Sequence, residues 1–284
     1  MIALAIAFGL AIGVALGALG GGGSILTVPA LVYALGQSAR AATAGSLVIV
    51  GIAAIAGTAG HARAGRVRWR AGTGFGVAGV AASFAGAWAN RAVNPNVLLL
   101  AFAGLMLVAA AGMLRRSGRA SSPAAVAGAE PGAAGPTGRV PVRADGGVRQ
   151  DRRTHARPST AATIARVVGA GLVVGFLTGF FGVGGGFVIV PGLIFSLGYR
   201  MPEAVATSLL VIAINSAAAL LARVGHVTFN WAVIVPFTLA AVAGSVGGKR
   251  ISEWLSATML TRAFVGLLLA VAGYVAARSI AGLA

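Results

Sequence analysis

The chain contains no cysteine among its 284 residues. Disulfide bonds, thiolate metal sites and cysteine nucleophiles are therefore excluded. Charged residues are also scarce, at 10 % of the chain, whereas a soluble domain carries roughly a quarter. Hydrophobic residues make up 58 %, and several apolar runs reach about twenty residues, the length that crosses a bilayer core. The composition predicts an all-α polytopic protein embedded in the lipid bilayer.

Acidic residues are the scarcest charged group, with five in the whole chain. Glu130, Asp145 and Asp151 lie in one polar stretch, and Glu203 and Glu253 lie near the ends of apolar segments. No carboxylate is expected within a membrane span, where proton and cation carriers commonly keep one. An anionic substrate is therefore favoured. No catalytic grouping, metal-binding spacing or phosphate-binding loop is found, so neither enzymatic activity nor a cofactor is predicted.

The net charge of +17 invites a nucleic-acid partner, but the position of the charges argues against one. Ten of the 22 basic residues lie between Arg115 and Arg166, in a stretch rich in Pro, Gly, Ala and Ser. Such a stretch cannot bury a core and is predicted to be a disordered, cytoplasmic linker. Basic loops beside membrane spans follow from the positive-inside rule. The predicted organisation is a first membrane repeat over 1–114, the linker over 115–165 and a second membrane repeat over 166–284.

The two membrane halves repeat one another at an offset of 162 residues. This shift places Gly9 on Gly171 and Pro29 on Pro191. It also relates further glycines and a Ser-Leu pair: Gly13, Gly17, Gly20, Gly22, Gly23, Gly36 and Ser46-Leu47 fall on Gly175, Gly179, Gly182, Gly184, Gly185, Gly198 and Ser208-Leu209. An internal duplication explains so many coincidences at one offset.

Each half offers five apolar segments, of which the second is too short to span a bilayer alone. The segments lie near 2–19, 24–36, 43–60, 72–90 and 97–114, and near 164–181, 186–198, 204–222, 231–248 and 258–280. If every segment crosses the bilayer, each half has five crossings, and this odd number gives the two halves opposite orientations. The inverted arrangement places 18 basic residues inside and 4 outside. A parallel arrangement of four crossings per half, with re-entrant short segments, is the alternative. Inversion is favoured, with 8 to 10 crossings left open.

Glycine clusters interrupt the apolar runs at matching places in both halves, at 20–24 and at 182–186. Glycine allows a backbone turn, and irregular backbone at membrane depth is tolerated only beside protein or a water-filled cavity. Free N–H groups at the start of the following short helix then favour an anion, and Pro29 and Pro191 keep that helix short or bent. Paired discontinuous helices point to a transporter binding site. The predicted substrate-binding residues at these breaks are Gly21, Gly22, Gly23, Ser24, Gly184, Gly185 and Gly186.

Four polar residues within the third segments are further candidates for the substrate site: Ser46, Thr207, Ser208 and Asn215. They could contact a substrate or bridge helices, and the sequence leaves both open. Close helix packing is the alternative role for the glycines, above all for isolated ones spaced as small-xxx-small. His61 and His226 border basic loops and are expected at the membrane interface.

The motifs "GALGGGGSILTVPALVYALG" and "GFFGVGGGFVIVPGLIFSLGYRMPEAVATS" resemble the signatures of the sulfite exporter TauE/SafE family of bacterial transporters. The resemblance covers both halves and omits the linker. It implies a permease of the bacterial inner membrane, built from two repeats, for sulfite, sulfonates or related organosulfur anions. It points to the paired glycines, the two prolines and the regions of Ser46 and Ser208. The first half departs from the pattern, since Gly45 stands where the second half has Thr207.

The sequence therefore predicts a secondary transporter for a small anion. A passive anion channel and a non-transporting membrane scaffold are the alternatives. The sequence specifies neither the anion, the direction of transport, the coupling ion nor the oligomeric state.

Overall fold

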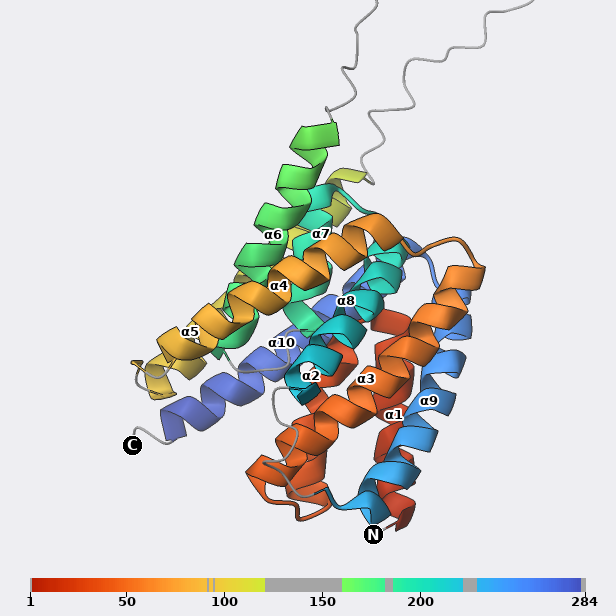
Figure 1. Ribbon diagram of the computed structural model, residues 1–284, viewed down its shortest axis with the longest axis vertical. Helices are drawn as coiled ribbons and strands as arrows, with labels where there is room; N and C mark the ends of the chain where they lie inside the picture. Colours follow the sequence, from red (N-terminus) through yellow and green to blue (C-terminus); the bar gives the residue numbers. More distant parts are fainter. Residues whose placement is uncertain are drawn as a thin grey trace, which may run out of the picture.

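The computed structural model describes residues 2–90, 92–93, 95–120, 160–181, 186–221 and 229–281. Every regular element in these ranges is helical, which confirms the all-α class (Figure 1). The elements are α1 (Ile2–Leu19), α2 (Gly22–Pro29), the π-helical turn η1 (Ala30–Ala34), α3 (Ala39–Arg63), α4 (Trp69–Asn90), α5 (Pro95–Ala120), α6 (Thr160–Phe181), α7 (Gly186–Leu197), α8 (Met201–Leu221), α9 (Trp231–Trp254) and α10 (Ala257–Ala281). The linker prediction falls mostly on residues outside the described ranges.

Six helices in the described part of the chain are long and apolar enough to cross a membrane. They are Ile2–Leu19, Ala41–Arg63, Ala161–Phe181, Met201–Leu221, Trp231–Trp254 and Ala257–Tyr274. Many large apolar side chains on their outer faces are exposed, such as Leu4, Val173 and Leu239. A soluble helix would bury such residues, whereas a lipid-facing helix presents them to acyl chains. The protein is therefore a polytopic membrane protein.

Glycines bring α1 into backbone contact with α9. Every fourth residue from Gly9 to Gly17 is a glycine, and a Cβ added at any of them would overlap the backbone of α9. The overlapped residues, in order, are Phe237, Ala241 and Ser245. Small residues allow this close approach, which maximises van der Waals contact where lipid provides no hydrophobic driving force. Since the contacts advance together along both helices, α1 and α9 run in the same direction.

The α4–α6 pair is packed in the same way. Gly171, Gly175 and Gly179 of α6 lie against the backbone of α4. The contacted residues, in order, are Phe75, Gly79 and Ser83. The offset of 162 residues found in the sequence relates these contacts to those of α1 and α9, because it places Gly9 on Gly171 and Phe75 on Phe237.

The remaining long helices connect these two pairs. Gly51 and Gly57 of α3 face Ser216 and Leu209 of α8, so that α3 and α8 are antiparallel. In Figure 1, α1, α3 and α9 gather on one side of the molecule and α4, α5 and α6 on the other, with α2 and α8 between them. Helix α10 packs along α5.

The second apolar segment of each half is short, as predicted. In the first half it is split, since α2 ends at Pro29 and continues as the wider turn η1. Proline has no N–H for the helical hydrogen bond, so the turn that contains it is readily distorted. In the second half α7 has 12 residues and contains Pro191.

Candidate functional site

The two glycine breaks meet inside the protein. Gly20 adopts a positive φ of 71°, a conformation that glycine adopts without strain, and it ends α1. The next residue, Gly21, lies so close to Gly186 that an added Cβ would overlap the Gly186 carbonyl group. Backbones 165 residues apart in the sequence are therefore in direct contact at the starts of α2 and α7. Gly184 and Gly185, predicted for the same site, lie outside the described residues.

A cleft of about 920 Å³ opens beside this contact. It lies between α2, α3, α4, α6 and α8, and residues of α5 and α10 close it further. Among the described residues that line the cleft, none carries a charge. Its polar lining consists of hydroxyl groups and one amide: Ser24, Thr43, Ser46, Ser83, Thr178, Asn215, Ser216 and Tyr274.

Three predicted site residues, Ser24, Ser46 and Asn215, are brought together at this cleft, and Pro29 also lines it. The Ser24 hydroxyl donates a hydrogen bond to the Gly21 carbonyl at 2.7 Å, and the Ser46 hydroxyl donates to the Thr43 carbonyl at 2.8 Å. Each hydroxyl oxygen keeps lone pairs, and either donor can be turned toward a ligand at the cost of one local bond. The Oδ1 atom of Asn215 is buried and has no hydrogen-bond partner in the described structure.

The other predicted residues lie behind the lining. Gly22 lies beneath Leu267, and Gly23 lies on the backbone of α1 at Leu16. Ser208 is fully buried, donates to the Val205 carbonyl at 2.8 Å, and lies against Gly20. Each of these contacts is a packing contact around the first break.

Thr207 is also placed away from the cleft. It is fully buried, and its Oγ1 accepts a hydrogen bond from the backbone N–H of Arg68 at 3.3 Å, in the loop before α4.

We expect Thr207→Val to lower the stability of the protein by about 1 kcal/mol, since the N–H of Arg68 loses its acceptor. This corresponds to a fall of about 2–4 °C in the thermal midpoint of the purified protein. Anion affinity should stay within about twofold, because the hydroxyl faces a loop and not the cleft; a larger loss would place Thr207 in the site.

Five polar lining residues were missed by the sequence analysis: Thr43, Ser83, Thr178, Ser216 and Tyr274. Ser83, Thr178 and Tyr274 are isolated hydroxyl groups in long apolar helices, and Ser216 directly follows the predicted Asn215. Thr43 was passed over in the same way, although it lies one helical turn before Ser46. Only the packing of five different helices brings these hydroxyl groups to one cavity.

A cluster of charged residues lies at the C-terminal end of α3, whereas the residues of α3 that line the cleft are in its N-terminal half. Glu253 of α9 pairs with Lys249 at 3.5 Å and with Arg66 at 3.9 Å, and Glu203 of α8 pairs with Arg68 at 2.7 Å. The pairs of Arg66 and Arg68 tie the loop between α3 and α4 to the ends of α9 and α8, whereas the Lys249–Glu253 pair lies within α9. His61, expected at the membrane interface, lies beside this cluster and is fully buried within the protein.

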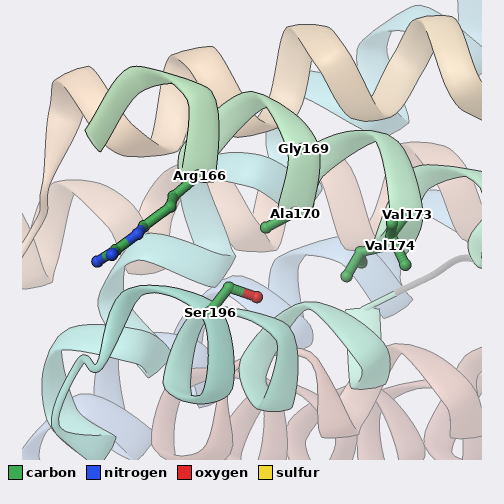
Figure 2. Close-up of a pocket in the computed structure, with 6 residues that line it drawn as sticks. All are labelled: Arg166, Gly169, Ala170, Val173, Val174 and Ser196. Carbon is green, nitrogen blue, oxygen red and sulfur yellow. The ribbon is translucent and has the colours of Figure 1, made fainter. Parts of the chain in front are cut away.

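A second, smaller hollow of about 420 Å³ lies between α6 and α7 (Figure 2). Its lining residues are Arg166, Gly169, Ala170, Val173, Val174 and Ser196. Figure 2 shows the Arg166 side chain extending from α6 toward one end of this mostly apolar hollow. None of the predicted site residues lines it, so the larger cleft is the candidate functional site.

Membrane-crossing helices around a cleft, with two helices broken at their contact, define the class of polytopic membrane transport proteins. Comparison with known proteins agrees: the model of the sulfite exporter TauE/SafE family matches residues 5–275. The chain belongs to this family.

Two bacterial relatives match most of the chain. A "Probable membrane transporter protein" of Xylella fastidiosa strain Temecula1 is 32 % identical over 277 residues, which are 96 % of this chain and 94 % of that protein. The "Probable membrane transporter protein YunE" of Bacillus subtilis strain 168 is 26 % identical over 261 residues, which are 88 % of this chain and 86 % of that protein. No solved structure matches the chain. The family and these relatives identify a membrane transporter.

Proposed function

We propose that the protein is a secondary transporter of the bacterial inner membrane and carries a small anion, such as sulfite, thiosulfate or a sulfonate. The observation that supports this most directly is the composition of the cleft. Its lining offers hydroxyl groups and an amide, and no described lining residue is a carboxylate that would favour a cation. Ser24 lines the cleft in the first turn of α2, where the N–H groups and the helix dipole favour negative charge.

The contact between the two breaks favours a transporter over a channel. Gly21 lies against Gly186 with no room for a Cβ, so the two backbones are packed together and leave no opening at their contact. A channel needs a continuous pore in its conducting state, whereas a transporter alternates between states that open to one side at a time. In this proposal the C-terminal end of α3, next to the ion pairs of Arg66 and Arg68, lies on the closed side of the transport pathway.

The direction of the helices supports inverted repeats as the framework of this movement. The offset of 162 residues pairs α1 with α6, α3 with α8 and α4 with α9. Within the pair α3–α8 the two helices run antiparallel, as repeats related by an axis in the membrane plane require. Rocking of one repeat against the other would exchange the open and closed sides. The family name motivates sulfite as the first substrate to test.

The proposal is tested by thermal shift of the purified protein with a panel of small compounds. Sulfite, sulfate, thiosulfate, sulfoacetate, taurine and acetate would each be added over a range of concentrations. A ligand at a hundred times its Kd adds about 2.7 kcal/mol of stability, enough to raise the thermal midpoint by several degrees. We expect one or more of sulfite, thiosulfate and sulfoacetate to do this, and Ser24→Ala to reduce the shift. If no anion stabilises the wild type while its fold is intact, the proposed anion site is wrong.

A further inference from the structure

The side chain of His61 caps the C-terminal end of α1, just before the break at Gly20. His61 lies in the last turn of α3 and is fully buried. Its Nε2 atom is 3.1 Å from the carbonyl oxygen of Gly17, in the last turn of α1. Carbonyl groups in the last turn of a helix lack partners within the helix. His61 therefore supplies a donor to a carbonyl just before the break at Gly20.

This hydrogen bond fixes the tautomer of the imidazole ring. A carbonyl oxygen only accepts, so Nε2 must carry the hydrogen atom. In the neutral ring, Nδ1 then holds a lone pair, and it is the only atom at which His61 can gain a proton. Nδ1 is buried and has no hydrogen-bond partner in the described structure. The ring is thus held by one nitrogen, while the other keeps a lone pair without a partner among the described residues.

The charged groups near His61 come from two elements packed against it. The loop after α3 contributes Arg66, and α9 contributes Lys249 and Glu253. Helix α1 contributes no titratable side chain. Glu253 pairs with both cations, at 3.9 Å and 3.5 Å, and Arg66 is also tied back to α3 by its N–H, which donates to the His61 carbonyl at 3.3 Å.

We infer that Nδ1 of His61 is a proton-binding site, and that the proton is the ion coupled to the movement of the anion. A proton there places a third positive charge beside Glu253. The imidazolium attracts Glu253 and repels Arg66 and Lys249, which weakens the Arg66–Glu253 pair that ties α9 to the loop before α4. The same ring also binds the Gly17 carbonyl, three residues before the break at Gly20. His61 therefore connects the charged residues at the end of α3 with the helix break, and Ser24, just after that break, lines the cleft.

The coupling half of this inference rests on the proposed anion transport, whereas proton binding at Nδ1 does not. The first experiment therefore needs no substrate. Side-chain nitrogen NMR of the full-length protein, labelled with 15N histidine, reports the tautomer and protonation of its three histidines, His61, His155 and His226. The His61 signals are assigned by their loss in His61→Gln, whose amide can still donate to Gly17. We expect an Nε2–H tautomer whose Nδ1 gains a proton as the pH is lowered; an Nδ1 that stays unprotonated at every pH at which the protein remains folded would overturn the proton site.

The second experiment measures coupling in proteoliposomes that contain a pH-sensitive dye. Gradients of sulfite, thiosulfate or sulfoacetate would be imposed in turn, and anion flux and internal pH followed together. Wild type and a His226→Gln control should move protons with the anion, whereas His61→Gln should keep anion flux and lose proton flux by about tenfold or more. Undiminished proton flux in His61→Gln would contradict the coupling. If no anion moves even in the wild type, it is the proposed function that fails, and the NMR titration still decides the proton site.

Discussion

Gly175→Leu should prevent the protein from folding stably, whereas Gly169→Leu, on the same helix, should be tolerated. A Cβ at Gly175 would overlap the backbone of α4 at Gly79, and backbone cannot move aside as a side chain can. A leucine there would force α4 and α6 apart and remove the contacts on which membrane helix association depends. At Gly169 nothing lies within 4 Å of an added Cβ.

The expected cost of Gly175→Leu is about 3 kcal/mol or more, at the upper end of overpacking effects, because several neighbouring contacts are lost together. The measurement is the yield of monodisperse protein in detergent and its thermal midpoint, for wild type and both variants. Gly169→Leu should match the wild type within about 2 °C. If both variants were equally stable, the α4–α6 contact would not be the close glycine interface described above.

Asn215→Leu should weaken anion binding by about tenfold to hundredfold without destabilising the protein. Asn215 lines the cleft, and its Oδ1 is buried without a partner. A half-turn of the carboxamide exchanges Oδ1 and Nδ2, so the side chain can donate a hydrogen bond to an anion. A hydrogen bond to a charged group contributes about 1.5–3 kcal/mol, which corresponds to roughly a tenfold to hundredfold loss of affinity when it is removed.

The stability of Asn215→Leu should equal or exceed that of the wild type, since an apolar group replaces a buried polar atom that lacks a partner. Ala217→Leu is the matched control, because Ala217 is two residues further along α8 and is exposed. Both variants would be tested by thermal shift and by equilibrium binding of any anion that stabilises the wild type. Normal affinity in Asn215→Leu would remove this amide from the anion site.

The helix breaks could be predicted because their cause is local. A cluster of glycines followed by a proline destabilises a helix wherever it occurs, and its recurrence in both halves marked it as a feature of the fold. The glycines of α1 and α6 were also recognisable as packing residues, since a spacing of four places them on one face. Which helix each face meets, α9 or α4, depends on residues far away in the chain.

Neighbouring polar residues show what sequence reasoning could not resolve. Thr207 and Ser208 are adjacent, yet one bonds to the loop at Arg68 and the other lies against Gly20. Consecutive helical residues point in directions about 100° apart, so adjacency in sequence does not imply a shared site. Asn215, two turns further along α8, does reach the cleft together with Ser24 and Ser46.

The burial of His61 is a further feature that the sequence alone could not predict. Its place between an apolar segment and a basic loop is typical of an interfacial residue. In the folded protein the residue is buried against α1, where its Nε2 donates to the Gly17 carbonyl in the last turn of that helix.

The sequence by itself determined the class of protein, the places where helices break and the scarcity of acidic groups, because these follow from composition and from local backbone preferences. Only the tertiary structure decided which polar side chains share a cleft, which glycines meet, and where the one buried histidine of the described residues points. Those depend on the register between helices, which is set by contacts between residues more than a hundred positions apart, such as Gly21 with Gly186.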